Sequence, residues 1–148
     1  MMHQLTYARL ITADDPDVPQ LLRVHSLPGV AEYLSISDGY FRYVTGSDGV
    51  HFFKVYESGN LVGSVHLERQ GLTLFMAILV FPEHQGSGLG SAILRDVQDD
   101  VFGLGYERIE AAIDESNAAS LLLFERAGFR RTGQVDELIT FVYHRNRT

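Results

Sequence analysis

Six residues in the second half of the chain, Gln85-Gly86-Ser87-Gly88-Leu89-Gly90, constrain its fold more than any other segment. They lie between the apolar run Phe75 to Phe81 and the amphipathic stretch Ala92 to Phe102. Glycine at alternate positions lets the backbone adopt conformations closed to residues with a Cβ, and it lets a ligand approach the main chain. The pattern predicts a strand, an anion-binding turn and a helix.

Phosphate oxygens are the natural ligands of such a turn. The first N–H groups of a helix have no partners within the helix, and the helix dipole adds partial positive charge there. A P-loop is excluded because Ser91-Ala92 follows Gly90, where a Lys-Ser/Thr pair is required. The dinucleotide-binding pattern fits poorly because the glycines are spaced G-x-G-x-G. A pyrophosphate site and a simple strand-to-helix connection both stay open.

Composition narrows the class of protein. With 148 residues, 45% of them hydrophobic, the chain is expected to form a single domain over residues 1–148. Its formal net charge of -7 argues against nonspecific binding to nucleic acid or to anionic membranes. The absence of cysteine excludes disulfides, thiolate metal sites and cysteine nucleophiles. The six histidines show no metal-binding spacing, so no metal is predicted.

The N-terminus has no basic region followed by an apolar core, and no apolar run approaches the ~20 residues of a membrane span. A cytoplasmic protein is therefore expected.

Alternation and turn residues predict the remaining elements. The expected strands are Leu5 to Thr12, His51 to Glu57, Leu61 to Glu68, Thr73 to Phe81, Arg108 to Ile113, Arg130 to Gly133 and Leu138 to Arg145. The expected helices are Val18 to His25, a turn at Val30 to Leu34, the stretch from Ala92, and Ala118 to Ala127 before Gly128.

The apolar patterns also predict which residues are buried. Thr73 to Phe81 is almost unbroken in its apolar character, which indicates a central strand buried on both faces. Ile93, Val97 and Val101 lie at helical spacing and are expected to form the buried face of one helix. Leu61 is expected to share one strand face with Val65, Leu67 and Gly63, and that face is expected to be in the core.

Asn117 is a favourable N-cap residue for the helix that ends at Gly128-Phe129. Taken together, the order strand, Gln85-x-x-Gly88-x-Gly90, helix, strand, Asn117-x-x-Ser120, helix and Gly-Phe resembles the GNAT superfamily of acetyl-CoA-dependent N-acetyltransferases. The resemblance covers Phe75 to Phe129. It implies an α/β (α+β) fold in three layers, with a mixed central sheet of about six or seven strands, a splayed central pair, and helices on both faces.

The resemblance also implies acetyl-CoA as acetyl donor. The cofactor's pantetheine arm would pair with the middle strand, its pyrophosphate would bind the amides of the glycine-rich turn, and the Asn motif would contact it from the other side. The implied cofactor-binding residues are Ile78, Leu79, Val80, Gln85, Gly86, Ser87, Gly88, Leu89, Gly90, Ser91, Asn117, Ser120 and Phe124.

By the same resemblance, an amine attacks the thioester directly in a ternary complex, and a main-chain N–H near Val80 stabilises the oxyanion. Two positions depart from the family pattern. Phe124 stands where many GNAT enzymes have a Tyr that protonates the leaving thiolate, and Ala112 stands where ribosomal-protein-type acetylases have a Glu. The remaining candidates are Glu110, Glu68 and His66 as bases and Tyr143 as an acid, each of which is also a typical structural polar residue.

The expected function is acetyl transfer to a primary amine of a small molecule or of a protein or peptide. A non-catalytic acyl-CoA sensor and a purely structural domain are the alternatives, and a homodimer stays possible. Acceptor contacts are expected from the N-terminal helices, the loop around Ser35 to Gly49 and the last hairpin. Four aromatic residues of this part are candidates to line the acceptor pocket or to pack in the core: Tyr33, Tyr40, Phe41 and Tyr43.

Overall fold

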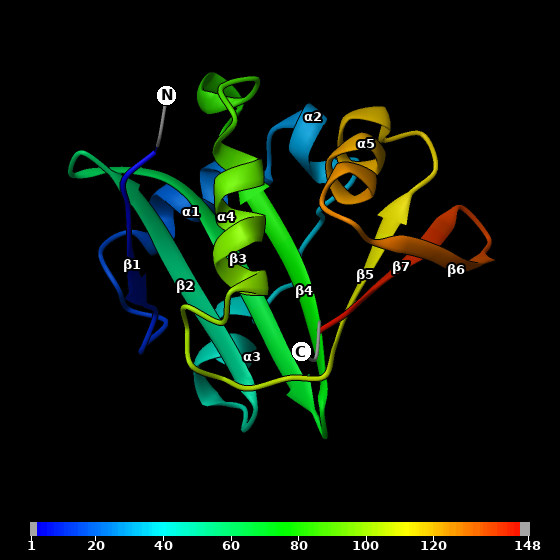
Figure 1. The fold of residues 1–148 in the computed structure, drawn as a ribbon. Helices are drawn as coiled ribbons and strands as arrows, with labels where there is room; N and C mark the ends of the chain where they lie inside the picture. The colour runs from blue at the N-terminus through cyan, green and yellow to red at the C-terminus, as the bar shows by residue number, and fades with distance from the viewer. Residues whose placement is uncertain (1–2, 146–148) are drawn as a thin grey trace.

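A computed structural model describes residues 3–145. This part of the chain forms a seven-stranded sheet in the order β1-β2-β3-β4-β5-β7-β6, with helices on both faces (Figure 1). The strands are β1 Leu5–Arg9, β2 Val50–Glu57, β3 Asn60–Gln70, β4 Thr73–Val80, β5 Arg108–Asp114, β6 Arg130–Val135 and β7 Leu138–His144. Neighbouring strands are antiparallel except β4 and β5, which are parallel. The predicted mixed sheet is confirmed.

The helices are α1 Val18–His25, α2 Pro28–Ala31, α3 Tyr40–Gly46, α4 Leu89–Gln98 and α5 Ala118–Arg126, and a 3-10 turn spans Pro82–His84. Helix α3 lies in a segment for which the sequence predicted only a loop; it begins after Gly39, whose φ is +80°. Each helix among the described residues is too short or too polar to span a lipid bilayer.

Two hydrophobic cores lie on opposite faces of the sheet. One core packs α4 and α5 against the sheet, and the other packs α1, α2 and α3 (Figure 1). Strand β4 contributes to both, because Met76 is buried in the first core and Leu79 in the second. The prediction of a strand buried on both faces is therefore confirmed, except at Ala77, which is exposed where a cavity opens.

A bulge in β3 changes the faces of its first residues. Val55 pairs with Gly63 and Tyr56 with Leu61, so that Val62 is an extra residue without a partner. Val62 consequently turns into the core under α4, whereas Leu61 packs against the opposite core. The prediction for Leu61 was wrong because simple alternation cannot reveal an inserted residue.

Helix α4 is shorter than predicted. It ends at Gln98, and Asp100 then adopts a φ of +55° that takes the chain out of the helix. The Asp100 carboxylate accepts hydrogen bonds from the N–H groups of Leu104 and Gly105, at 3.0 and 3.1 Å. Val101 is therefore 57% exposed, and its predicted place on the buried face was wrong. Local side-chain bonding to the backbone outweighed the helical spacing.

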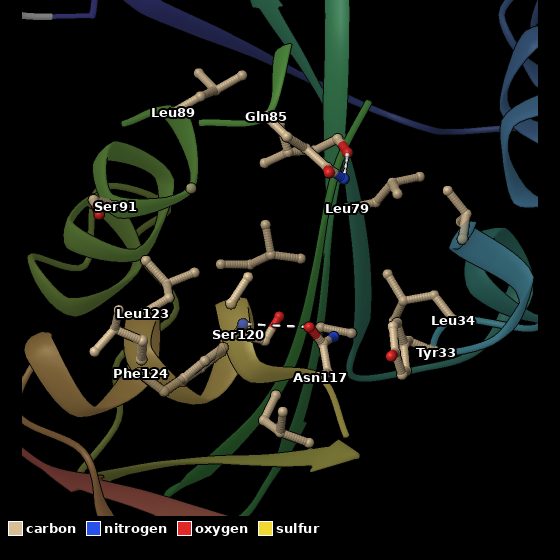
Figure 2. Close-up of a pocket in the computed structure, with 18 of the residues that line it drawn as sticks. Tyr33, Leu34, Leu79, Gln85, Leu89, Ser91, Asn117, Ser120, Leu123 and Phe124 are labelled. Atoms are coloured by element: carbon tan, nitrogen blue, oxygen red, sulfur yellow. Dashed lines mark hydrogen bonds between the residues drawn. The ribbon is translucent and has the colours of Figure 1, made fainter. Parts of the chain in front are cut away.

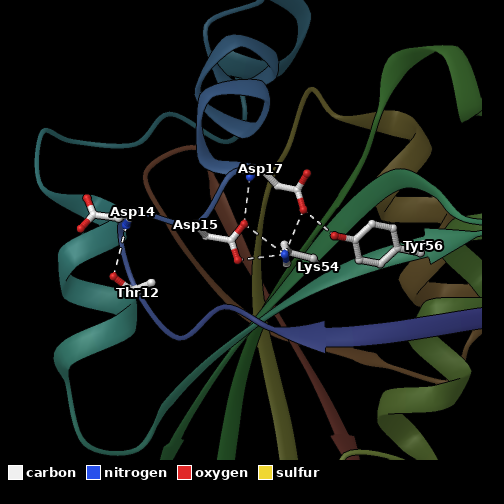
Figure 3. Close-up of polar contacts among 6 residues, drawn as sticks. All are labelled: Thr12, Asp14, Asp15, Asp17, Lys54 and Tyr56. Carbon is white, nitrogen blue, oxygen red and sulfur yellow. Dashed lines mark hydrogen bonds and ion pairs between the residues drawn. The ribbon is translucent and has the colours of Figure 1, made fainter.

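A charged cluster ties strand β2 to the start of α1 (Figure 3). Lys54 Nζ lies 2.9 Å from carboxylate oxygens of both Asp15 and Asp17, and the Tyr56 hydroxyl donates to Asp17 at 2.5 Å. Burial alone would lower the pKa of Lys54, but the bonds to the two carboxylates raise it above its ordinary value. The cluster therefore joins strand β2 to the N-terminal end of α1, the helix whose last residue is His25.

Candidate active site

Strands β4 and β5 separate to form a cleft. They pair only where Thr73 to Phe75 face Arg108 to Glu110. Beyond that point β4 continues along β3, and β5 continues along β7. A cavity of about 490 Å³ fills the opening, lined by β4, the glycine-rich turn, β5, α5, and α2 with the segment after it that carries Tyr33 (Figure 2). The predicted splayed central pair is confirmed, and the cavity has the size of a cofactor site.

The β4 side of the cleft offers main-chain groups for pairing. Phe81 donates its N–H to Val62 at 2.9 Å, so this residue faces β3. Successive residues of an antiparallel ladder alternate in direction, which turns Val80 and Ile78 toward the cleft and Leu79 toward β3. The carbonyl oxygen of Val80 accepts a hydrogen bond from Gln85 Nε2 at 3.1 Å. An extended ligand can therefore add to this edge at alternate residues.

The turn before α4 presents a run of open donors. Gly86 and Gly88 have φ values of +80° and +85°, the left-handed conformation that favours glycine. None of the main-chain N–H groups from Gly86 to Ser91 donates to another residue in the described range, and the first partnered amide is that of Ala92. His3 bonds to the Ser87 carbonyl oxygen at 2.7 Å and also to the Glu57 side chain. His3 thus links the turn to the end of β2. Six successive unpartnered N–H groups beside a cavity fit phosphate oxygens.

Helix α5 forms the opposite wall (Figure 2). Asn117 caps it, because its Oδ1 accepts the N–H of Ser120 at 3.3 Å, and both residues line the cavity. Phe124 is 3% exposed and packs edge-on against Phe129 with ring centroids 5.0 Å apart. Arg126 also lines the cavity and has no acidic partner within the described part of the chain. This wall thus combines an apolar surface with one free cation.

A second, smaller cavity of about 160 Å³ lies on the other side of β4, among α1, α3, β2 and β3. The two cavities share Ala77, Ile78 and Leu79 of β4 as lining residues. Ligands in the two cavities would therefore meet at the same short stretch of strand.

A chain of polar side chains enters the smaller cavity. The Tyr40 hydroxyl lies 2.5 Å from His66 Nδ1, and His66 Nε2 lies 3.5 Å from Glu68 Oε1. Burial raises the pKa of Tyr40 and lowers that of His66, so we assign the hydroxyl as donor and the imidazole as neutral, with its proton on Nε2. The Tyr43 hydroxyl donates to Glu68 at 2.6 Å and lowers the pKa of that carboxyl. A proton accepted at Tyr40 can pass to His66, where the Glu68 carboxylate stabilises the positive charge.

Comparison with known proteins decides the family. The acetyltransferase (GNAT) family model matches residues 19–129, which is most of the chain. The chain belongs to the GNAT family. Among solved structures, the spermidine N-acetyltransferase from Vibrio cholerae in complex with CoA and spermine has a TM-score of 0.82, with 19% identity over 96% of each chain. An aminoglycoside acetyltransferase in complex with coenzyme A has a TM-score of 0.79, with 18% identity over 96% of this chain and 95% of its own.

Curated relatives of this GNAT protein match over shorter stretches. The L-amino acid N-acyltransferase MnaT of Escherichia coli (strain K12) is 35% identical over 68 residues, 46% of this chain and 40% of the relative. The mycothiol acetyltransferase of Thermobispora bispora is 30% identical over 92 residues, 57% of this chain and 31% of the relative. The chain thus spans less than half the length of these curated relatives.

The candidate bases and the candidate acid of this GNAT protein divide into two groups. His66 lines the smaller cavity and Glu68 lies behind it. Glu110 instead pairs with Arg108 at 3.0 Å, at the point where β4 and β5 are still joined, and Tyr143 packs against Phe129. Neither Glu110 nor Tyr143 is among the described residues that line the two cavities. No group of three potential metal-ligating side chains occurs between residues 3 and 145.

Arg126 and His25 line the cavities but were not singled out from the sequence. Arg126 is the last residue of α5, and His25 is the last residue of α1. His25 follows the helical spacing of the buried residues Val18 and Leu21, and a polar residue on such an apolar face is the signal that could have identified it. Arg126 carries no comparable signal.

Proposed function

We propose that this protein is an N-acetyltransferase that transfers the acetyl group of acetyl-CoA to a primary amine. The observation that carries the proposal is the run of six unpartnered N–H groups beside a cleft whose β4 wall borders a second cavity. Acetyl-CoA, when bound, supplies the acyl group as an activated thioester. The named relatives act on amino acids, spermidine and aminoglycosides, which supports an amine acceptor.

Each wall of the larger cavity has a part in holding the donor. The amides from Gly86 to Ser91 bind the pyrophosphate, and the guanidinium of Arg126 attracts further phosphate charge. Ile78 and Val80 offer main-chain groups to the extended pantetheine arm. The Gln85 side chain then gives up its hydrogen bond to the Val80 carbonyl oxygen, which becomes free for the ligand. Asn117 holds α5 at the cleft through its cap, and Phe124 provides an apolar wall.

The smaller cavity receives the acceptor. In this proposal the amine gives up a proton to the oxygen of Tyr40 as the proton of that hydroxyl passes to His66 Nδ1. The imidazolium that results faces the Glu68 carboxylate, which lowers its free energy. Phe124 has no proton to donate and Ala112 has no group that accepts one. The relay supplies the missing base, and the departing CoA thiolate takes its proton from water.

Calorimetric titration with acetyl-CoA, paired with measurement of thiol release across a panel of amines, tests the proposal. We expect saturable binding at one site and an acetylated product that mass spectrometry identifies. Absence of acetyl-CoA binding would overturn the assignment. Binding without product over the whole panel would point instead to an acyl-CoA sensor.

The same proposal extends to the whole chain. Residues 1–148 would act as one acetyltransferase domain in the cytoplasm, on an amine of a small molecule or of a peptide. A homodimer stays a prediction; the all-exposed strand β6 is an edge at which a second copy could pair.

A further inference from the structure

We propose that the smaller cavity selects acceptors that carry a second hydrogen-bond donor besides the reacting amine and no carboxylate, with His25 Nε2 as the atom that receives this donor. The inference rests on the proposed function and deepens it, because it names the class of acceptor.

His25 has one nitrogen in use and one open. Its Nδ1 donates to the carbonyl oxygen of Leu34 at 2.9 Å, which leaves Nε2 as a hydrogen-bond acceptor. Although His25 is only 8% exposed, Nε2 has no partner within the described part of the chain. The residue lines the smaller cavity, and burial lowers its pKa, so the lone pair is free at neutral pH. Buried polar atoms are almost always bonded in native proteins, so an open acceptor in a cavity wall calls for a donor from a ligand.

The charges around the cavity argue against an acidic acceptor. None of the described residues that line it is Lys or Arg. The negatively charged Glu68 lies 3.5 Å from His66, which lines the cavity. A carboxylate in this cavity would face the lone pair of His25 and lack a cation, which disfavours its transfer from water. Apolar side chains such as Phe52 and Leu79 cover much of the remaining wall. The fitting ligand is a short amine with an apolar body.

Distances set the length of that body. The ring centroids of His25 and Tyr40 are 6.3 Å apart, so one ligand can place its amine at Tyr40 and a second donor at His25 across a few bonds. The volume of about 160 Å³ corresponds to about five water molecules of ~30 Å³ each. An amino alcohol or a diamine with a chain of about three carbons satisfies both limits.

The test compares 3-aminopropan-1-ol with butylamine, which has the same number of heavy atoms but no second donor, and with β-alanine, which carries a carboxylate. At saturating acetyl-CoA we expect kcat/KM to be at least about tenfold higher for 3-aminopropan-1-ol than for either competitor. In His25→Phe the ratio to butylamine should fall to near one. His51→Phe, which replaces a histidine outside both cavities, should keep the wild-type ratio. Equal ratios in wild type and His25→Phe would overturn the inference.

A second readout is independent of turnover. With CoA bound, the ¹⁵N resonance of His25 Nε2, assigned by its loss in His25→Phe, is followed during titration with each amine. We expect a shift toward a hydrogen-bonded acceptor with 3-aminopropan-1-ol and none with butylamine. Equal responses to both amines would mean that only water satisfies Nε2, and the inference would fail. Failure of acetyl-CoA binding would sink the proposed function instead, so the two failures are distinguishable.

Discussion

The backbone of Gly63 on β3 touches the carbonyl oxygen of Leu79 on β4. A Cβ built at Gly63 would lie 2.3 Å from that oxygen, which is closer than atoms in proteins approach each other. This contact stands beside the β3 bulge and at the residues where the two cavities meet. Glycine at this position therefore allows the end of β4 to take the path that borders the cleft.

The first prediction follows from this contact. Gly63→Ala should push the end of β4 away, lower the free energy of unfolding by about 1–3 kcal/mol, and weaken acetyl-CoA binding. Urea unfolding and calorimetry measure the two effects. Gly133→Ala is the control, because a Cβ at Gly133 meets no atom within 4 Å. Wild-type binding and stability in Gly63→Ala would show that β4 does not depend on this approach.

The glycine-rich turn supplies a second, matched comparison. Gly86 and Gly59 both have a φ of +80°, and a Cβ at either position meets no atom within 4 Å. Alanine at each position should cost a similar ~1–2 kcal/mol of backbone strain. Only Gly86→Ala should also weaken acetyl-CoA binding, by tenfold or more, because its methyl group enters the space of the pyrophosphate. Equal affinities in the two variants would argue against main-chain binding at the turn.

A third prediction concerns the Tyr40 hydroxyl, which lies 2.5 Å from His66 Nδ1. Tyr40→Phe removes the first group of the proposed relay and should lower kcat by about 10²-fold, while the affinity for acetyl-CoA stays within about twofold of wild type. Tyr7→Phe is the control; its hydroxyl donates to Asp96 at 2.6 Å, and Tyr7 lines neither cavity. A kcat for Tyr40→Phe equal to that of the control would remove Tyr40 from the mechanism.

The pH dependence of kcat gives a fourth prediction. Burial lowers the pKa of His66 below its ordinary 6.5, although hydrogen bonding to Glu68 opposes this shift. Activity should therefore be full at neutral pH and fall only as the pH drops through a value below 6.5. Glu68→Gln removes the carboxylate that raises the pKa of His66, so the acidic limb of kcat, measured at saturating substrates, should move to still lower pH. The plateau rate should also decrease, because the carboxylate no longer stabilises the imidazolium. A shift to higher pH would contradict the assignment.

The cluster around Lys54 yields a fifth prediction (Figure 3). Lys54→Met leaves two carboxylates without their cation and should cost about 3 kcal/mol in urea unfolding at pH 7. The pKa of Asp17 is lowered, chiefly by the Tyr56 hydroxyl and then by Lys54, so the stability from this carboxylate is present above pH 3.8. This stability is lost as the pH falls through the lower pKa of the folded state. The difference between wild type and variant should therefore shrink once the pH falls below 3.8.

Arg131→Met is the control for Lys54→Met. Arg131 pairs with Glu125 at the surface, where losing the ion pair is expected to cost about 0–1 kcal/mol of stability. A cost for Lys54→Met as small as that of the surface pair would mean that the cluster does not hold α1 in place.

Residues close together in the sequence determined much of the wall of the larger cavity. The order of strand, turn and helix around Gly86 and Gly88, and the cap at Asn117, were predicted correctly, although the helix spans Leu89–Gln98 and not Ala92 to Phe102. These features depend on backbone freedom and on hydrogen bonds between residues a few positions apart, which a single sequence displays directly. The lack of a hydroxyl at Phe124 is equally a property of the sequence.

Tertiary structure decided the smaller cavity, which we propose as the acceptor site. His25, Tyr40 and His66 come from α1, α3 and β3, and the hydrogen bond from Tyr40 to His66 joins residues 26 positions apart. Their meeting depends on how α1 and α3 pack against the face of the sheet that carries His66. Such contacts are fixed by packing among distant segments, and no periodicity within one segment encodes which partner it will meet.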